Sequence, residues 1–398
     1  MNKRIPLEEL KNRMINFIDK MNNNNPSWKF ILILSKINLY YFTGTMQDGL
    51  LIIKRDSPPI FWVRRSFERA KEESLFENIK SISSLRELES KYKDMDSEIL
   101  FLETNIVTLS LLKKLNKYLN FKETKSIDYT INSTRSVKSN YELDLLIKSG
   151  NIHQKVMEEK IPHMLKEGMS ELELASKIFS TMLEEGHHGV ARFSMFDTEI
   201  SLGHIAFGES SLYPTYFNGP GGNFGLSPSM PFLGSRDRKL KKGDLIFIDV
   251  GCGYEGYHTD KTMTYVFGKP LPNDVVKIHN KCVDIQNQIS QILVPGNTPG
   301  NIYKKIMGEL DQDFLNNFMG YKNRKVKFLG HGVGLVIDEI PVIAESFREP
   351  LVKNMVLAIE PKIGISKIGM VGIENTFIIN ENSSICITGS NNGLIYID

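Results

Sequence analysis

Short apolar runs alternate with amphipathic stretches in the first third of the chain. The runs bounded by Gly, Pro or Asp predict strands at residues 28–34, 39–44, 50–55, 60–63 and 98–103. Apolar residues at helical spacing predict helices at residues 65–74, 84–93 and 107–120, and an amphipathic helix within residues 1–25. Strands that alternate with helices are typical of a small α/β domain. We place its boundary after residue 132, which leaves residues 133–398 for a second domain.

The second domain begins with a clear helical pattern and continues into a glycine-rich region. Ser139, followed three residues later by Glu142, predicts a capping box at the start of a helix. Ser170 predicts the N-cap of a second helix, which we expect to stop at Gly186. Residues 200–242 are rich in Gly, Pro, Ser and Asn, and such a long irregular segment is usually functional or disordered. Its aromatic residues favour a packed segment: Tyr213, Tyr216, Phe217, Phe224 and Phe232.

Composition narrows the class of protein. The chain has 398 residues, of which 41% are hydrophobic and 24% charged, as expected for a soluble protein with sizeable cores. A net charge of +2 gives no reason to expect nucleic acid or an anionic membrane as a partner. The three cysteines are widely spaced, which argues against a disulfide framework and favours a reducing compartment. Without a signal-peptide pattern or a long apolar run, we expect a cytoplasmic protein.

Two carboxylates stand out in the stretch "GDLIFIDVGCGYEGYHTDKT" (residues 243–262). An apolar strand runs into Asp249, and Asp260 lies on the strand that returns. A two-residue loop at Tyr254 and Glu255 would place the two acids directly opposite each other, with Cβ atoms about 5 Å apart. Like charges in that position destabilise a sheet, so we expect a shared proton, a basic side chain or a divalent cation between them.

Three further polar residues lie in apolar or glycine-rich contexts downstream. His331 occurs in "FLGHGVGL", Glu360 in "VLAIEPKI" and Glu374 in "MVGIENTFII". Each residue alone is commonly structural, but buried acids in strands are rare unless they are paired or bind metal. Four carboxylates and one imidazole match two divalent cations, and this donor set suits Mn, Fe, Co or Zn. Two such ions activate one bridging water, which predicts a hydrolytic centre.

The motifs "IFIDVGCGYEGYHTDKT", "FLGHGVGL", "AIEP" and "GIENTFII" resemble those of the pita-bread metallopeptidases, which include aminopeptidase P, prolidase, creatinase and the methionine aminopeptidases. The resemblance runs from about residue 135 to the end. The N-terminal stretches "INLYYFTGTMQDGLLIIKR" and "FWVRRSFERAKE" resemble the creatinase-type domain, which methionine aminopeptidases lack. The implied fold is an α/β creatinase-like domain over residues 1–132 and an α+β pita-bread catalytic domain over residues 133–398.

The resemblance also implies roles for the site residues. Asp249 would chelate one metal ion, while Asp260 and Glu374 would bridge both ions. His331 and Glu360 would hold the other ion, and Glu360 would also take a proton from the bridging water. The implied reaction is hydrolysis of short peptides, in which a metal-bound hydroxide attacks the scissile amide carbonyl. The implied assembly is a homodimer whose N-terminal domain closes one end of the site.

Five positions bear on how this chain departs from the proline-specific members of the family. Those members carry three accessory histidines, and the matching positions here are Phe232, Lys327 and Asp338. An arginine usual after the second acid is replaced by Met263. His204 is a candidate to replace the upstream histidine in space. The metal ligands therefore match the family, whereas the residues expected to contact substrate differ.

Three functions follow from this pattern. The first is a dinuclear hydrolase of short peptides, similar to an Xaa-Pro aminopeptidase or dipeptidase, with Glu360, Asp338 and His204 as candidate catalytic residues. The alternative is a metal-dependent hydrolase or lyase of small molecules on the same scaffold, with Asp338 and Lys327 in acid–base roles. The third is a catalytically silent binding protein. Metal content and a panel of dipeptides distinguish the three.

Overall fold

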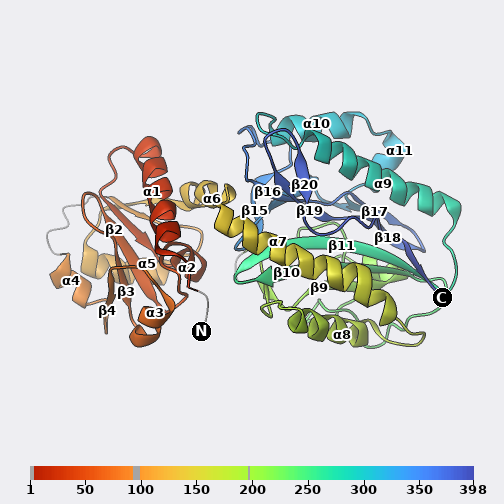
Figure 1. The fold of residues 1–398 in the computed structure, drawn as a ribbon, viewed down its shortest axis with the longest axis horizontal. Helices are drawn as coiled ribbons and strands as arrows, with labels where there is room; N and C mark the ends of the chain where they lie inside the picture. Colours follow the sequence, from red (N-terminus) through yellow and green to blue (C-terminus); the bar gives the residue numbers. More distant parts are fainter. Residues whose placement is uncertain (1–3, 93–98, 196–197) are drawn as a thin grey trace. The chain divides into compact units, whose positions relative to one another are not determined.

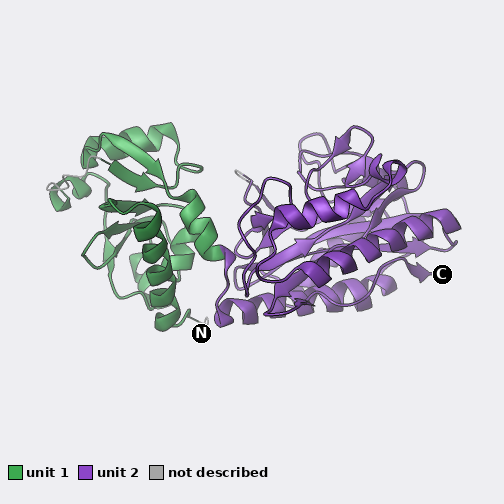
Figure 2. Ribbon diagram, turned by 90° about the horizontal axis from the view of Figure 1, so that it is seen from above, with its two compact units in different colours: residues 1–135 green, residues 136–398 purple. Residues whose placement is uncertain are grey.

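The computed structural model describes residues 4–92, 99–195 and 198–398. The chain separates into two compact units, residues 1–135 and residues 136–398, which are coloured separately in Figure 2. In the described parts of the chain, the structure contains no helix that is both long and apolar enough to cross a membrane.

The first unit is built on a six-stranded sheet with strand order β4-β3-β2-β1-β5-β6 (Figure 1). Its strands are β1 (Phe30–Ile33), β2 (Gly49–Lys54), β3 (Ile60–Val63), β4 (Ile79–Ser81), β5 (Ile99–Leu102) and β6 (Glu123–Ser126). Its helices are α1 (Leu7–Asn24), α2 (Lys36–Thr43), α3 (Phe67–Glu73), α4 (Glu87–Lys91), α5 (Leu109–Leu119) and α6 (Asp128–Ser136). Parallel and antiparallel pairs both occur, and the α/β class predicted for this part of the chain is confirmed.

One predicted strand of this unit is wrong, because residues 39–44 belong to helix α2 and its C-cap. The side chain of Ser35 accepts a hydrogen bond from the Asn38 backbone N–H at 3.4 Å, which caps the start of the helix. Gly44 has a φ of 75° and donates its N–H to the Tyr40 carbonyl at 2.8 Å, which ends the helix. These two caps outweigh the strand preference of an apolar, aromatic run.

The second unit contains helices α7 (Asn140–Gln154), α8 (Glu171–Glu184), α9 (Asn273–Ile292), α10 (Pro299–Gly308) and α11 (Gln312–Leu315). One sheet has the order β21-β11-β10-β9, with β9 (Gly203–Phe207), β10 (Leu245–Tyr254), β11 (Tyr257–Phe267) and β21 (Ile395–Ile397). A second has the order β15-β14-β16-β19-β20, with β14 (Gly330–Val333), β15 (Ile337–Val342), β16 (Val356–Ile359), β19 (Asn375–Ile379) and β20 (Ser384–Cys386).

Two smaller sheets complete the second unit. One has the order β13-β12-β17-β18, with β12 (Gly320–Tyr321), β13 (Arg324–Lys325), β17 (Lys362–Ile365) and β18 (Gly369–Gly372). The other pairs β7 (Ala191–Arg192) with β8 (Glu199–Ile200). The capping box predicted at Ser139 is present and opens α7. Ser170, predicted as an N-cap, opens α8 and forms a capping box with Glu173.

Apolar side chains divide this unit into two cores. Helices α7 and α8 pack against β9, β10 and β11, whereas α9 and α10 pack against β16 to β19 (Figure 1). The two main sheets meet at β11 and β19, where the backbones of Thr262 and Glu374 form an isolated bridge with two N–H···O bonds of 3.3 Å. Asp260 N–H also donates to Thr376 Oγ1 at 3.0 Å. The acidic residues of two distant sequence motifs therefore share one seam between sheets.

The register of the β10–β11 hairpin differs from the predicted one. The loop is Glu255–Gly256, with φ values of 48° and 92°, as a type I′ turn requires, so it lies one residue later than predicted. Asp249 consequently pairs with Thr262, and Asp260 pairs with Gly251. The pairing shifts by two positions, so both acids stay on one face of the sheet but lie diagonally rather than directly opposite.

Two histidines hold the end of this hairpin in place. His187 Nδ1 accepts the N–H of Gly253 at 2.9 Å, and His188 Nδ1 accepts the N–H of Gly256 at 3.1 Å. A Cβ on Gly253 would lie 2.1 Å from His188 Nε2, so this position requires glycine. The two histidines therefore have a structural role beyond the end of α8.

The irregular segment at residues 200–242 is packed only in part. Phe217 and Phe232 are buried and lie 5.1 Å apart between ring centroids. Tyr213, Tyr216 and Phe224 are each about half exposed. The segment begins with β9, which lies beside β10 and brings His204 next to Asp249 in the sheet.

Candidate metal centre

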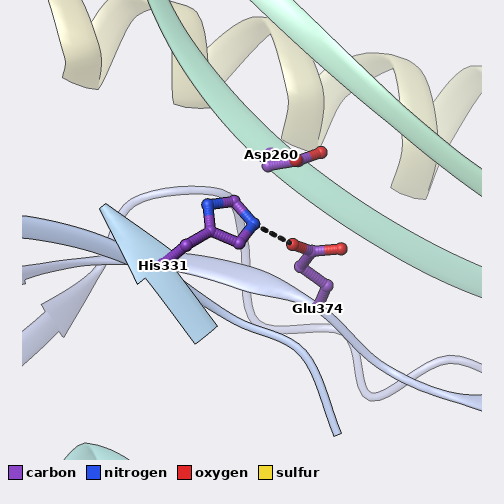
Figure 3. Close-up of side chains that lie close together, drawn as sticks. All are labelled: Asp260, His331 and Glu374. Atoms are coloured by element: carbon purple, nitrogen blue, oxygen red, sulfur yellow. Dashed lines mark ion pairs between the residues drawn. The ribbon is translucent and has the colours of Figure 1, made fainter. Parts of the chain in front are cut away.

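Three buried residues from different strands offer metal-ligand atoms within 4.8 Å of one another. They are Asp260 on β11, His331 on β14 and Glu374 immediately before β19, and Figure 3 shows their side chains converging. A fourth group, Glu360, follows β16 directly. His331 Nε2 lies 3.5 Å from Glu360 Oε1 and 3.7 Å from Glu374 Oε1. Residues more than a hundred positions apart in the sequence thus meet in one polar cluster.

The strands around His331 fix the orientation of its imidazole. A Cβ on Gly330 would lie 2.2 Å from the Ala358 carbonyl oxygen, so glycine is needed for β14 and β16 to approach this closely. His331 Nδ1 lies 3.2 Å from the Gly332 carbonyl oxygen and 3.6 Å from Asp338 Oδ1. A proton on Nδ1 directed at these oxygens leaves Nε2 as an acceptor toward the acids, as in a metal-binding histidine.

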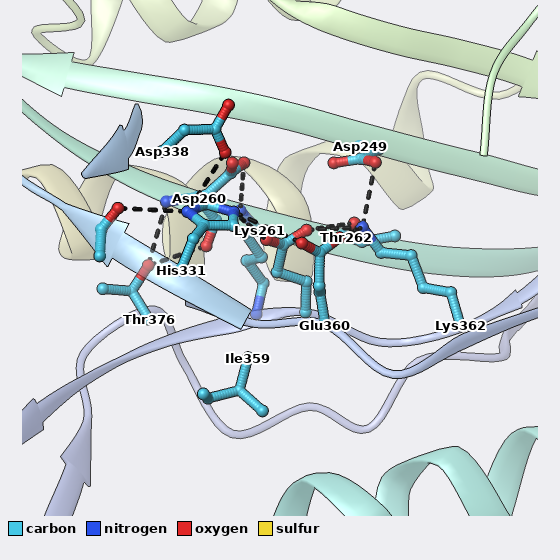
Figure 4. Close-up of polar contacts among 12 residues, drawn as sticks. Asp249, Asp260, Lys261, Thr262, His331, Asp338, Ile359, Glu360, Lys362 and Thr376 are labelled. Carbon is cyan, nitrogen blue, oxygen red and sulfur yellow. Dashed lines mark hydrogen bonds and ion pairs between the residues drawn. The ribbon is translucent and has the colours of Figure 1, made fainter. Parts of the chain in front are cut away.

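A buried lysine lies among the acids, and sequence analysis did not identify it. Lys362 Nζ donates to Asp249 Oδ2 at 3.1 Å and to Glu360 Oε2 at 3.0 Å (Figure 4). It also donates to Glu374 Oε2 at 2.7 Å. Its side chain is 0% exposed. The available signal was the spacing in "IEPKI", because side chains two residues apart in an extended chain point to the same face.

The charges in this cluster shift one another's pKa values. Burial raises the pKa of Asp260 well above its usual range, and the charges of Glu374 and Asp249 raise it further. Burial raises the pKa of Glu360 to about 8, although Lys362 opposes the rise. Burial by itself lowers the pKa of Lys362, but Asp249, Glu360 and Glu374 outweigh it and hold that pKa well above its usual value. The lysine is therefore a cation, and the remaining acids favour further positive charge nearby.

Two carboxylate oxygens of the cluster are suited to a metal ion. Glu360 Oε1 and Glu374 Oε1 are buried and have no hydrogen-bond donor among the described residues. Leaving such oxygens without a partner costs free energy, and both lie beside His331 Nε2. Together with Asp260, these oxygen and nitrogen donors fit a divalent ion such as Mn, Fe, Co or Zn.

The other candidate catalytic residues line the same small cavity of about 50 Å³. His204 faces it from β9, with its ring stacked on Phe232 at 6.2 Å between centroids and its Nε2 3.4 Å from Thr215 Oγ1. Burial lowers the pKa of His204 to about 4, so the imidazole is neutral at neutral pH. Asp338 lies beside His331 with a φ of 67°, and its buried Oδ2 has no hydrogen-bond partner within the described residues.

Two of the residues that depart from the family pattern lie away from this cavity. Lys327 is exposed and is not among the cavity-lining residues. Met263 is fully buried on the opposite face of β11 from Asp260, in the core with Met157 and Tyr265. Met263 therefore has no direct contact with a substrate in the cavity, and the role considered for Lys327 in acid–base chemistry has no geometric support.

Comparison with known proteins gives matches over both units. The model described as "Metallopeptidase family M24" matches residues 144–381, and that described as "Creatinase/Prolidase N-terminal domain" matches residues 13–137. An Xaa-Pro dipeptidase of Pyrococcus furiosus is 28% identical over 392 residues, which cover 98% of this chain and 100% of that relative.

Solved structures agree with this architecture. The prolidase from Pyrococcus horikoshii OT3 is 27% identical, with a TM-score of 0.77 and coverage of 96% of this chain and 99% of its own. An Xaa-Pro dipeptidase from Bacillus anthracis has a TM-score of 0.79 at 21% identity, covers 98% and 99% of the two chains, and shows the shared fold alone. The predicted combination of a creatinase-like domain with a pita-bread domain is confirmed.

Proposed function

Because the chain belongs to metallopeptidase family M24, we propose that it is a metal-dependent peptidase that hydrolyses Xaa-Pro dipeptides at the centre described above. The observation that carries this proposal is the convergence of Asp260, His331 and Glu374 on one wall of a cavity. Other lining residues are apolar and suit a proline ring: Phe193, Ile200, Leu202 and Phe217. Relatives of nearly the same length are named Xaa-Pro dipeptidases, which favours a dipeptide over a longer substrate.

Glu360 has two roles in this proposal, as a ligand and as a base. A divalent ion held by Asp260, His331, Glu360 and Glu374 would supply polarisation of the scissile carbonyl and acidification of a water molecule. Glu360 would also accept the proton of that water, because its Oε1 has no hydrogen-bond donor in the described structure. Whether the centre binds one ion or two depends on Lys362, because its ammonium lies among the same carboxylates.

His204 and Asp338 have different roles in this proposal. His204 contacts the substrate, because its neutral imidazole faces the cavity and is held between Phe217 and Phe232. Asp338 positions His331, because Asp338 Oδ1 lies 3.6 Å from His331 Nδ1 on the side away from the acids. The homodimer and the cytoplasmic location stay predictions that rest on the resemblance and on composition.

Replacing His204 by phenylalanine is expected to lower kcat/KM for an Xaa-Pro dipeptide by roughly 100-fold, the usual cost of one positioned hydrogen-bond donor. The substitution keeps an aromatic ring against Phe232, so packing changes little. His204→Gln, which retains a donor, should recover part of the loss. Metal content, measured on the same samples, should equal that of the wild type; an unchanged kcat/KM would remove His204 from the substrate contacts.

A substrate panel tests the proposed function. The purified protein, supplied with Mn²⁺ or Co²⁺, is assayed on Xaa-Pro dipeptides, Xaa-Pro-Xaa tripeptides and dipeptides without proline. We expect Xaa-Pro dipeptides to be cleaved fastest, with activity lost in a chelator and restored by the ion. Bound metal without cleavage of any peptide would instead favour a small-molecule hydrolase or lyase. Absence of both metal and activity would favour a binding protein.

A further inference from the structure

The surroundings of Lys362 are those of a bound cation. An ammonium group has three N–H donors, and here three different carboxylates each accept from Nζ at 2.7 to 3.1 Å. The group is fully buried, and its backbone pairs with Gly372 in the β17–β18 ladder. Moving this charge away from the acids without exposing it to water would leave a buried ammonium without a partner, which is strongly unfavourable. Lys362 is thus fixed in the cluster.

The oxygens of the cluster fall into two sets. Asp249 Oδ2, Glu360 Oε2 and Glu374 Oε2 are directed at Lys362. The other oxygens of Glu360 and Glu374, both Oε1, lie beside His331 Nε2 and accept no hydrogen bond from the described residues. Glu360 and Glu374 therefore each connect two cation positions, one of which holds the lysine.

We propose that the Lys362 ammonium takes the place of one of the two cations expected for this centre, so that the protein binds a single divalent ion at Asp260, His331, Glu360 and Glu374. This inference rests on the proposed function as a metal-dependent peptidase. Asp249, predicted from sequence as a metal ligand, is then the ion-pair partner of Lys362.

The balance of charge agrees with one divalent ion. The four acids of the centre carry four negative charges when all are ionised, and two divalent ions alone would neutralise them. With the lysine present, one divalent ion leaves these four acids with a single negative charge, whereas a second ion would place two more positive charges beside a tethered ammonium. Asp338, on the Nδ1 side of His331, lies outside this set of four acids. Like charges at such short range in a buried site repel strongly. A second ion bound to the oxygens around Nζ would also need the space that Lys362 fills.

The number of bound ions tests this proposal directly. Metal-free protein is equilibrated with Mn²⁺, freed of unbound ion, and analysed for manganese per chain by mass spectrometry. We expect one ion per chain in the wild type and two in Lys362→Ala, which removes the ammonium and opens its space. Lys353→Ala serves as the matched control, because it removes a half-exposed lysine that pairs with Glu381 on the surface. The control should keep one ion.

The possible results separate the proposed role of Lys362 from the proposed metallopeptidase function. Two ions in the wild type, or one ion in a folded Lys362→Ala protein, would overturn the role of Lys362 and leave the metallopeptidase function standing. No bound ion in the wild type would overturn both. If Lys362→Ala does not fold, anomalous diffraction from wild-type crystals with Mn²⁺ gives the answer. One peak beside His331 supports the proposal, and a second peak among Asp249, Glu360 and Glu374 contradicts it.

Discussion

Replacing His331 by alanine is expected to lower the affinity for Mn²⁺ by at least about 100-fold and to remove peptide hydrolysis at micromolar metal. Changing only the partners of a metal ligand typically costs 10–100-fold in affinity, so loss of the imidazole itself should cost no less. His331 supplies a nitrogen ligand atom to the cluster, because its Nε2 lies 3.5 Å from Glu360 Oε1 and 3.7 Å from Glu374 Oε1. Isothermal titration calorimetry with the metal-free variant measures the loss.

His163→Ala is the matched control for this experiment, because His163 is an exposed histidine of the same unit at the end of a short helical turn. It should bind Mn²⁺ and cleave the dipeptide as the wild type does. If His331→Ala retained wild-type affinity while His163→Ala lost it, the cluster around Glu374 would not be the metal site. Far-ultraviolet circular dichroism establishes that both variants are folded.

Replacing Lys362 by methionine is expected to lower the free energy of unfolding by about 3–5 kcal/mol when divalent ions are chelated. Methionine keeps most of the side-chain volume but leaves three carboxylates, two of them buried, without their cation. Removing one partner of a buried ion pair typically costs this much, because the remaining charge is uncompensated. Urea unfolding of both proteins in a chelator gives the difference.

Two further variants separate this effect from general loss of charge. Lys353→Met breaks the exposed ion pair with Glu381 and should cost less than about 1 kcal/mol. Adding Asp249→Asn to Lys362→Met removes one of the stranded negative charges and should recover part of the stability. A Lys362→Met protein as stable as the wild type in chelator would show that the acids hold protons instead of relying on the ammonium.

The sequence was sufficient to locate the acids and the histidine of the centre. Asp249, Asp260, Glu360 and Glu374 are charged residues in apolar runs, and burial of such residues demands a partner. The structure brings all four, with His331, to the lining of one cavity. The unusual local context of each residue was enough, without knowledge of the sheet pairing that joins them.

The sequence was insufficient where two segments had to be placed against each other. The hairpin register depended on whether the turn began at Tyr254 or Glu255, and a positive φ at Glu255 decides this in the folded chain. The orientation of Met263 required knowing which face of β11 meets helices α7 and α8. The contact between Lys362 and Asp249 joins residues from two different sheets, and no local sequence pattern predicts how those sheets pack.

The secondary structure was likewise predictable where a local sequence motif determines it, and not where local preferences are ambiguous. Helices α7 and α8 were predicted because a capping box at Ser139 and an N-cap at Ser170 are visible in the sequence. Helix α2 was missed because an eight-residue apolar segment satisfies strand and helix preferences alike. The deciding groups there, Ser35 and Gly44, are caps whose weight is clear only once the helix is formed.

The most direct test of a one-ion metallopeptidase is to titrate metal-free wild-type protein with Mn²⁺ while following hydrolysis of an Xaa-Pro dipeptide. At protein concentrations well above the dissociation constant, we predict no activity without metal and a linear rise that stops at one equivalent of Mn²⁺ per chain. Hydrolysis that continues to rise up to two equivalents would contradict the proposal that the Lys362 ammonium replaces a second ion. Hydrolysis undiminished in chelator would contradict the metal centre itself.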